Sequence, residues 1–288
     1  MKELLILSGK GGTGKTTIAS AFIKLANVHA YADCDVDAPN LHLVMGGLPE
    51  PVYSDYYGLD KAEIDPDLCT KCDLCRQHCR FDAINVDEIY EVDNFACEGC
   101  SVCQAICPAN AIKMKPSVAG HLMLYKKDIV FSTAQLKMGS GNSGLLVTDV
   151  KKQLKTAAKD TEFAIIDGSP GIGCPVIASL SGVDMVLIVT EPSISGISDM
   201  ERIIETAQRF QTKIAVCINK YDTNLSNTEE IIKVCKKLNL PFVGNIPFDK
   251  EAVKAVNNGG TIVDIACQAG TVVKTVFKET IKILSNEI

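Results

Sequence analysis

The sequence predicts a doubly wound α/β fold, in which helices cover both faces of a mainly parallel sheet. Short apolar runs rich in β-branched residues are typical of strands buried on both faces. Segments with helical periodicity separate these runs, which favours parallel pairing through crossover helices. The strands are expected at residues 4–7, 163–166, 185–189, 214–218 and 242–246, and helices at 16–26, 198–210, 228–238 and 272–288.

A segment of different composition interrupts this pattern. Residues 62–117 are poor in leucine and hold ten carboxylates against five basic residues. The two halves of the segment repeat, since residues 69–84 resemble residues 97–112. A short internal repeat indicates a small duplicated domain. We therefore predict an α+β insert at 62–117 within a discontinuous domain of residues 1–61 and 118–288, with two strands at 120–133 and a loop at 139–144.

Eight of the thirteen cysteines lie in the insert, in two runs with the spacing C-x2-C-x2-C-x3-C. This is the ligand spacing of a two-cluster bacterial ferredoxin, in which the fourth cysteine of each run ligates the other cluster. The insert is therefore predicted to be a ferredoxin-type domain with two [4Fe-4S] clusters. One cluster is assigned to Cys69, Cys72, Cys75 and Cys107, and the other to Cys97, Cys100, Cys103 and Cys79.

Zinc is the alternative ligand, because paired C-x2-C motifs also make zinc sites. Pro108 follows the second run, as in ferredoxins, whereas Arg80 stands at the matching place after the first run. A cation beside Cys79 is expected to raise the reduction potential of its cluster.

A glycine-rich turn follows the first predicted strand and precedes the first predicted helix. Its sequence fits the phosphate-loop pattern G-x-x-x-x-G-K-[ST]. Lys15 is expected on the β- and γ-phosphates, and the Thr16 hydroxyl on Mg²⁺. The residues predicted to bind the nucleotide here are Gly9, Lys10, Gly11, Gly12, Thr13, Gly14, Lys15, Thr16 and Thr17.

A second lysine in this loop, Lys10, distinguishes it from most phosphate loops. The loop resembles the deviant phosphate loop of the MinD/ParA/Mrp ATPases, which are related to the nitrogenase iron protein. Residues 33–40 resemble the first switch of that family, and residues 165–171 resemble its Mg-side strand end and second switch. The fold implied is a P-loop NTPase that binds ATP and Mg²⁺.

The resemblance also implies roles for individual residues. Lys10 would reach across a homodimer interface to the nucleotide of the partner, and with Lys15 and Asp35 it completes the predicted catalytic set. Asp35 would position or activate the attacking water. Asp167 would hold the Mg²⁺ shell, with Asp33 assisting. Cys174 follows the second switch and is a candidate extra cluster ligand between two subunits. The alternative, an ordinary small loop residue, is favoured because residues 118–173 contain no counterpart of the second bridging cysteine.

The base of the nucleotide is the least determined part of this site. Residues 219–222 read Asn-Lys-Tyr-Asp, which resembles a base-reading motif of GTPases, so GTP remains an alternative. The family resemblance favours ATP, with Asn219 meeting the adenine and Pro247, in the segment 246–249, lining the base.

Charge and composition limit the class of partner. The net charge is −6 and the basic residues form no stripe, which argues against nucleic acid. Neither a signal peptide nor an apolar run long enough to span a membrane is evident, and cysteine-rich ligand motifs are typical of a reducing compartment, so we expect a cytoplasmic protein. Cys34, Cys217, Cys235 and Cys267 are expected to be ordinary buried thiols.

These observations predict an iron-sulfur ATPase that couples nucleotide-driven switching of a homodimer to electron transfer, with a redox partner that the sequence does not identify. The alternative is assembly or carriage of an iron-sulfur cluster or another metallocofactor for a client protein. Spatial organisation on a surface, in the manner of MinD, is less favoured because the last helix lacks a basic face.

Overall fold

The computed structural model describes residues 1–285, and they form two compact units. The first unit contains residues Met1–Tyr53, Leu122–Gln135 and those from Gly144 onwards. The second contains Ser54–His121 and Leu136–Ser143. The segment 62–117, predicted to be an insert, falls within this second unit.

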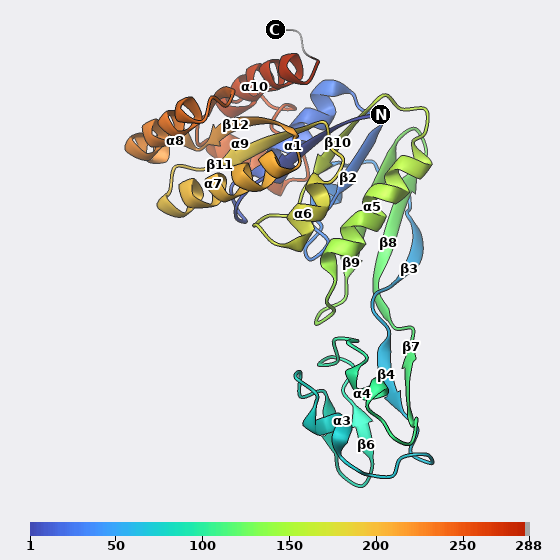
Figure 1. Ribbon diagram of the computed structural model, residues 1–288. Coiled ribbons are helices and arrows are strands. Elements are labelled where there is room, and N and C mark those ends of the chain that lie inside the picture. The colour runs from blue at the N-terminus through green and yellow to red at the C-terminus, as the bar shows by residue number, and fades with distance from the viewer. Residues whose placement is uncertain (286–288) are drawn as a thin grey trace. The chain divides into compact units, whose positions relative to one another are not determined.

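The first unit is built on a mainly parallel sheet, as predicted (Figure 1). The strand order is β13-β12-β11-β1-β10-β2-β9-β8-β3, and the pairs from β13 to β9 are parallel. The strands are β1 (Lys2–Leu7), β2 (Ala30–Asp33), β3 (Val52–Tyr57), β8 (Val118–Lys126), β9 (Val130–Leu136), β10 (Phe163–Asp167), β11 (Met185–Thr190), β12 (Lys213–Asn219) and β13 (Phe242–Ile246). All five strands predicted from apolar runs are present, and β8 and β9 account for the strands expected at 120–133.

Helices cover both faces of this sheet, which makes the fold doubly wound (Figure 1). Helix α1 packs with α10, and α7 packs with α8. The last predicted helix begins earlier than expected, at Gln268, and its final residues, 286–288, lie outside the described chain. The helices are α1 (Lys15–Ala26), α2 (Leu41–Val44), α5 (Ser143–Ala157), α6 (Cys174–Leu180), α7 (Ile194–Arg209), η1 (Tyr221–Thr223), α8 (Leu225–Lys237), α9 (Lys250–Asn257) and α10 (Gln268–Ser285).

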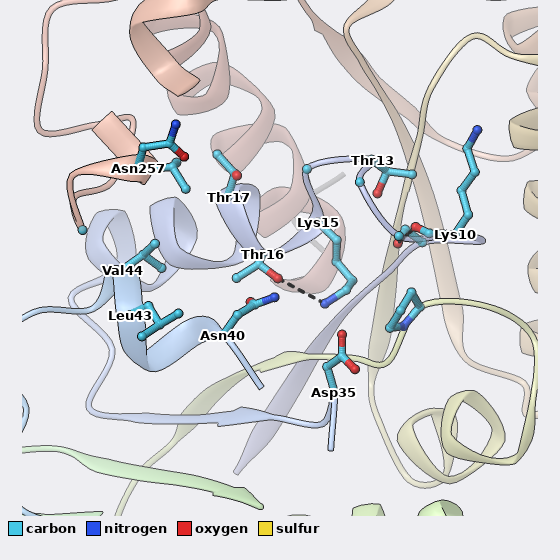
Figure 2. Close-up of a pocket in the computed structure, with 17 residues that line it drawn as sticks. Lys10, Thr13, Lys15, Thr16, Thr17, Asp35, Asn40, Leu43, Val44 and Asn257 are labelled. Atoms are coloured by element: carbon cyan, nitrogen blue, oxygen red, sulfur yellow. Dashed lines mark hydrogen bonds between the residues drawn. The ribbon is translucent and has the colours of Figure 1, made fainter. Parts of the chain in front are cut away.

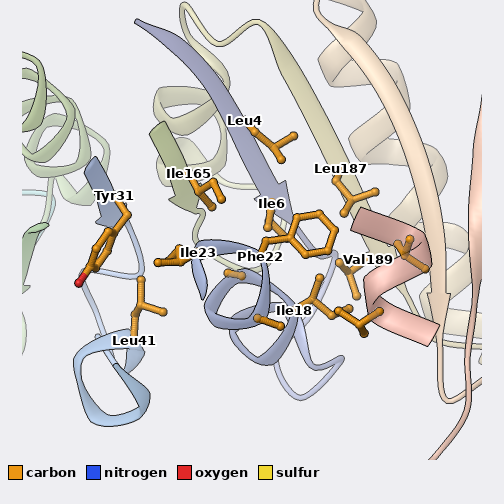
Figure 3. Close-up of a cluster of buried hydrophobic side chains, with 14 of the residues drawn as sticks. Leu4, Ile6, Ile18, Phe22, Ile23, Tyr31, Leu41, Ile165, Leu187 and Val189 are labelled. Atoms are coloured by element: carbon orange, nitrogen blue, oxygen red, sulfur yellow. The ribbon is translucent and has the colours of Figure 1, made fainter. Parts of the chain in front are cut away.

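The core lies between the sheet and helices α1 and α10. Leu4 and Ile6 alternate along β1, so both point to the same face, where they meet Phe22 of α1 (Figure 3). The ring of Phe22 packs edge-on against the ring of Phe277 of α10, with 5.1 Å between the ring centroids. This packing holds α1, and therefore the turn that precedes it, against the carboxyl end of β1.

The register of the central strands determines where the loops meet. Ile6 of β1 is level with Asp167 of β10, and Asp167 is level with Asp33 of β2. Because these strands are parallel, the loops after all three leave from the same edge of the sheet, where open α/β sheets bind their ligands.

The second unit consists of two similar halves. Strand β4 (Lys61–Ile64) pairs antiparallel with β7 (Ile112–Lys115), and β5 (Ile84–Val86) pairs antiparallel with β6 (Tyr90–Val92). The short helices α3 (Leu74–Gln77) and α4 (Val102–Ala105) take equivalent places in the two halves, 28 positions apart, as Cys97 follows Cys69.

The backbone conformation repeats as closely as the sequence does. Left-handed residues occur in equivalent pairs: Lys71 with Gly99, Asp73 with Ser101, and Asp82 with Asn110. A non-glycine residue with positive φ is uncommon, so three matched pairs indicate one loop conformation used twice. Among residues 1–285, no helix is long and apolar enough to cross a membrane.

Candidate functional site

The phosphate loop lies between β1 and α1, at the edge of the sheet described above. Gly14 occupies the N-cap of α1 with φ 90°, and a Cβ atom there would meet the Asn219 amide nitrogen at 2.3 Å. Position 14 therefore requires glycine. Backbone N–H groups at the start of α1 have no partner within the helix and, with the helix dipole, favour an anion.

Lys15 is buried at the centre of the site and contacts Asp167. Thr16 donates its hydroxyl hydrogen bond to the other carboxylate oxygen of Asp167, at 2.7 Å. Burial acts to lower the pKa of Lys15, but the charges of Asp167 and Asp33 outweigh it, and the pKa is raised. Lys15 is therefore a cation, paired with Asp167.

Asp33 organises the loop that follows β2. Its carboxylate accepts hydrogen bonds from the backbone N–H groups of Asp35, Asn40 and Leu41 at 2.9–3.0 Å. The side chain is fully buried, and burial, reinforced by the charge of Asp167, raises its pKa to about 7. This loop therefore folds around the single carboxyl group of Asp33.

A cavity of about 650 Å³ adjoins the phosphate loop (Figure 2). Asp35 lines it on the side of the first-switch segment, and burial raises the pKa of this carboxyl group. The Thr13 hydroxyl is buried and has no hydrogen-bond partner within the described chain. The other lining residues include Lys10 to Thr17, Asn40, Leu43, Val44, Pro170, Val256, Asn257 and Gly259.

A second cavity, of about 430 Å³, shares Gly12, Gly14 and Thr17 with the first. The predicted base-binding residues Asn219 and Pro247 both line it. The Asn219 side chain donates to the Thr13 carbonyl at 2.7 Å and accepts from the Lys220 N–H at 3.0 Å. Together the two cavities extend from the phosphate loop to the segment after β13.

Asp222, the residue that raised the GTP alternative, has another partner. Its carboxylate accepts a hydrogen bond from the Phe248 N–H at 2.8 Å, and Asp222 is not among the residues lining either cavity. The structure thus ties Asp222 to the segment after β13.

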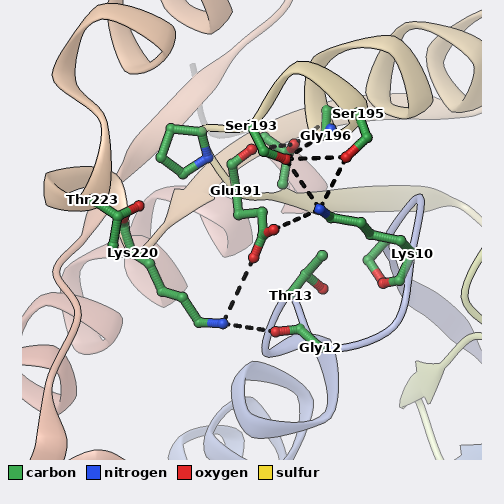
Figure 4. Close-up of polar contacts among 12 residues, drawn as sticks. Lys10, Gly12, Thr13, Glu191, Ser193, Ser195, Gly196, Lys220 and Thr223 are labelled. Atoms are coloured by element: carbon green, nitrogen blue, oxygen red, sulfur yellow. Dashed lines mark hydrogen bonds and ion pairs between the residues drawn. The ribbon is translucent and has the colours of Figure 1, made fainter.

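Lys10 lines the first cavity, and its ammonium group reaches the segment after β11 (Figure 4). Its ammonium group forms an ion pair with Glu191 at 2.6 Å and hydrogen bonds with the hydroxyl groups of Ser193 and Ser195 at 3.0 and 3.1 Å. The other Glu191 oxygen lies 3.7 Å from the ammonium group of Lys220, which donates to the Gly12 carbonyl. Sequence reasoning missed Glu191; the only available signal was its position just after a buried strand.

In the second unit, the eight insert cysteines line two separate cavities. We call the cavity lined by Cys69, Cys72, Cys75 and Cys107 the first cysteine site, and the cavity lined by Cys79, Cys97, Cys100 and Cys103 the second cysteine site. The two sets coincide with the two ligand sets predicted from spacing. All eight thiols are free, and within residues 1–285 no three cysteine, histidine or acidic side chains converge closely enough to hold one metal ion.

The remaining cysteines lie in the first unit. Cys34, Cys217 and Cys235 are buried and Cys267 is half-buried, and burial raises the pKa of each thiol. Cys174 is exposed at the start of α6, so it differs from these thiols.

Residues 4–262 match the model of the CobQ/CobB/MinD/ParA nucleotide-binding domain. An uncharacterised protein of Methanocaldococcus jannaschii is 34% identical over 96% of this chain and 95% of its own length. An iron-sulfur cluster carrier protein of Pyrococcus abyssi is 24% identical over 91% of this chain and 79% of its own length. The structure of MinD with Mg-ADP from Pyrococcus horikoshii OT3 aligns with a TM-score of 0.58 at 16% identity, covering 100% of this chain and 98% of that one.

Proposed function

The chain belongs to the CobQ/CobB/MinD/ParA nucleotide-binding family, and we propose that it is an ATPase that couples nucleotide-driven dimer switching to electron transfer through two iron-sulfur clusters. The observation that carries the redox half of this proposal is the separation of eight free cysteines into two cavities of four. Thiolates are the ligands of iron-sulfur clusters, and four are needed for each [4Fe-4S] cluster.

The arrangement of these cysteines favours clusters over zinc. A structural zinc ion needs four ligands converging on one point at about 2.3 Å for sulfur. In a [4Fe-4S] cluster each cysteine binds a different iron, so the sulfur atoms stand around a hollow. Clusters held in this way would supply one-electron chemistry. The matched left-handed residues would give the two cysteine-bearing loops the same conformation.

The nucleotide half of the proposal rests on the phosphate loop and its aspartates. Phosphoryl transfer requires mainly positioning and neutralisation of charge. ATP phosphates would attract Lys15 away from Asp167, which leaves Asp167 and Thr16 free to hold a Mg²⁺ ion. Asp33 has hydrogen bonds to both carboxylate oxygens already, so its proposed contribution is to hold Asp35 in place for the attacking water.

Adenine is favoured over guanine by the contacts of Asp222. Guanine recognition would need a carboxylate that accepts from the N–H donors of the base. Asp222 is instead occupied by the Phe248 amide, whereas Asn219 and Pro247 line the second cavity. We therefore assign ATP to this site.

Dimerisation would bring Lys10 to the phosphates of a second subunit. Its contacts with Glu191, Ser193 and Ser195 within one chain would then be exchanged for contacts in the partner. An added cation in the transition state is worth several orders of magnitude in comparable trans-acting sites.

Iron and sulfide analysis of anaerobically purified protein, with a coupled ATPase assay, tests both halves. We expect about eight iron and eight sulfide per chain, and ATP hydrolysis that Lys15→Met abolishes. Two zinc ions per chain without iron would refute the redox half. Hydrolysis unaffected by Lys15→Met would refute the nucleotide half.

The second candidate function is carriage of clusters, favoured by the similarity to the Pyrococcus abyssi carrier protein. Two closed sets of four ligands favour permanent clusters, whereas a carrier must release its cargo. Incubation with an iron chelator distinguishes them: retained iron supports electron transfer, and ATP-dependent loss of iron supports carriage.

A further inference from the structure

The two cysteine sites are related by the internal repeat, so each site provides a control for the other. We propose that the second cysteine site is the port through which electrons pass to a protein partner, and that this partner is a basic redox protein. The inference rests on the proposed function, because it requires clusters at both sites.

Both sites reach the surface to a similar degree. Cys72 of the first site and Cys100 of the second are equivalent in the repeat, and both are exposed. Exposure of the ligands therefore does not distinguish the two sites, and the side chains around them must.

An apolar rim surrounds the second cysteine site. Phe81 and Val102 line its cavity and are 43% and 42% exposed. Phe95, two residues before Cys97, is 78% exposed, and a Cβ atom on Gly139 would lie 3.6 Å from its ring. Met138 precedes Gly139 in the chain and is 94% exposed. Phe81, Phe95, Val102 and Met138 make up this apolar rim.

The equivalent positions at the first cysteine site carry a different chemistry. Phe95 corresponds to Asp67 and Phe81 to Ala109, 28 positions apart in each case. Leu74, at the place of Val102, is half-buried. Leu68, beside Cys69, is 49% exposed.

A polar network further marks the first cysteine site. Asp73 receives two hydrogen bonds from Arg76, at 2.6 and 2.7 Å, and one from the Tyr90 hydroxyl at 2.9 Å. The equivalents at the second cysteine site are Ser101, Gln104 and Ala62, which bring neither a guanidinium nor a phenol group. A partner docking over the first site would have to desolvate these charged groups, which is costly unless they are paired anew.

Apolar and aromatic side chains are what protein interfaces concentrate at their centres, and exposed phenylalanine and methionine are enriched there. Electron-transfer complexes are small, so a rim of four side chains next to an exposed ligand is a sufficient contact for a transient partner. The segment 62–117 as a whole carries ten carboxylates against five basic residues, and Glu98 lines the second cysteine site itself. A partner of complementary charge is therefore basic.

Cytochrome c, a basic haem protein that accepts one electron, serves as the probe. The protein is reduced with dithionite, freed of excess reductant and mixed with ferric cytochrome c; one electron passes to each ferric haem and gives ferrous haem, with no bond made or broken. We expect the double substitution Phe95→Ser with Met138→Ser to lower the second-order rate constant by about tenfold, as loss of central interface residues does. The matched control at the other site, Leu68→Ser, should change it by less than about twofold.

Hydrogen–deuterium exchange gives a second measurement that does not depend on electron transfer. Ferric cytochrome c should protect the amides of residues 93–100 and 136–143 and leave those of residues 65–76 unchanged. Met138→Lys provides a variant that cannot disturb packing at a 94% exposed position, and its added cation should weaken the protection at low salt.

The outcomes separate the two proposals. The assignment of the port would be overturned if protein with full iron content lost as much of its electron-transfer rate constant with Leu68→Ser as with the double substitution. Protection of residues 65–76 by cytochrome c would overturn it as well. Either result would leave the proposed function standing. Protein without iron would overturn both.

Discussion

Glu191→Gln is expected to strengthen ATP-dependent dimerisation. In the single chain Lys10 is held by Glu191 at 2.6 Å and by the Ser193 and Ser195 hydroxyls, and dimerisation as proposed must first break these contacts. Glutamine keeps the shape of the side chain and can still accept a hydrogen bond, so the substitution removes the charge attraction and little else.

The expected change in the dimer dissociation constant follows from the solvent exposure of the Lys10–Glu191 ion pair. The Lys10 and Glu191 side chains are 32% and 21% exposed, which is the range in which an ion pair contributes about 0.5–1 kcal/mol. A symmetric dimer releases two such pairs, so about 1–2 kcal/mol is regained, equivalent to a roughly 5- to 30-fold lower dimer dissociation constant. The difference should shrink at high salt, because a partly exposed pair is screened.

Sedimentation velocity with a non-hydrolysable ATP analogue measures this constant. Ser195→Ala, which removes one hydroxyl and no charge, should shift it by a smaller amount. Lys220→Met removes the other cation near Glu191 and checks that the effect passes through Lys10. A dimer of Glu191→Gln that is no tighter than wild type would refute the reasoning.

Three further outcomes are expected from the site geometry. Lys15→Met should weaken ATP binding about 10- to 100-fold in calorimetry, because it removes a charge-assisted hydrogen bond, whereas Lys24→Met, on the exposed side of the same helix, should bind normally. Wild-type protein should bind ATP more tightly than GTP, and Asp222→Ala should lower ATP affinity without reversing that preference; a reversal would place Asp222 on the base. Burial raises the pKa of Cys217 to about 12, so mass spectrometry after iodoacetamide treatment at pH 8 should find Cys174 alkylated and Cys217 intact. The stability contributed by the Cys217 thiol should be present below pH 9 and decline as the pH rises above 9. Rapid labelling of Cys217 in the native protein would contradict its burial.

Short segments determined much of the fold and of the candidate site. The central strands were predictable because a run of β-branched residues buried on both faces needs no distant information. The phosphate loop was predictable because its backbone geometry depends on glycines and a following helix within a few residues. The two sets of four cysteines were proposed from the ligand spacing of a two-cluster ferredoxin, in which the fourth cysteine of each run belongs to the other set, and the same two sets line the two cavities.

Contacts between distant residues were decided by the tertiary structure alone. Glu191 contacts Lys10 because both follow parallel strands whose carboxyl ends lie at one edge of the sheet. The sequence around either residue does not indicate that the two side chains form a pair. The occupation of Asp222 by the Phe248 amide, and of Asp33 by three backbone N–H groups, depends likewise on where separate loops come to rest. The contrast between the two cysteine sites also required the structure, because a residue's type does not tell whether its side chain is exposed. Local sequence specifies a conformation when the interactions that stabilise it join residues close together in the chain. Ion pairs between distant residues, hydrogen bonds between loops and surface exposure arise only when the packed elements bring remote groups together.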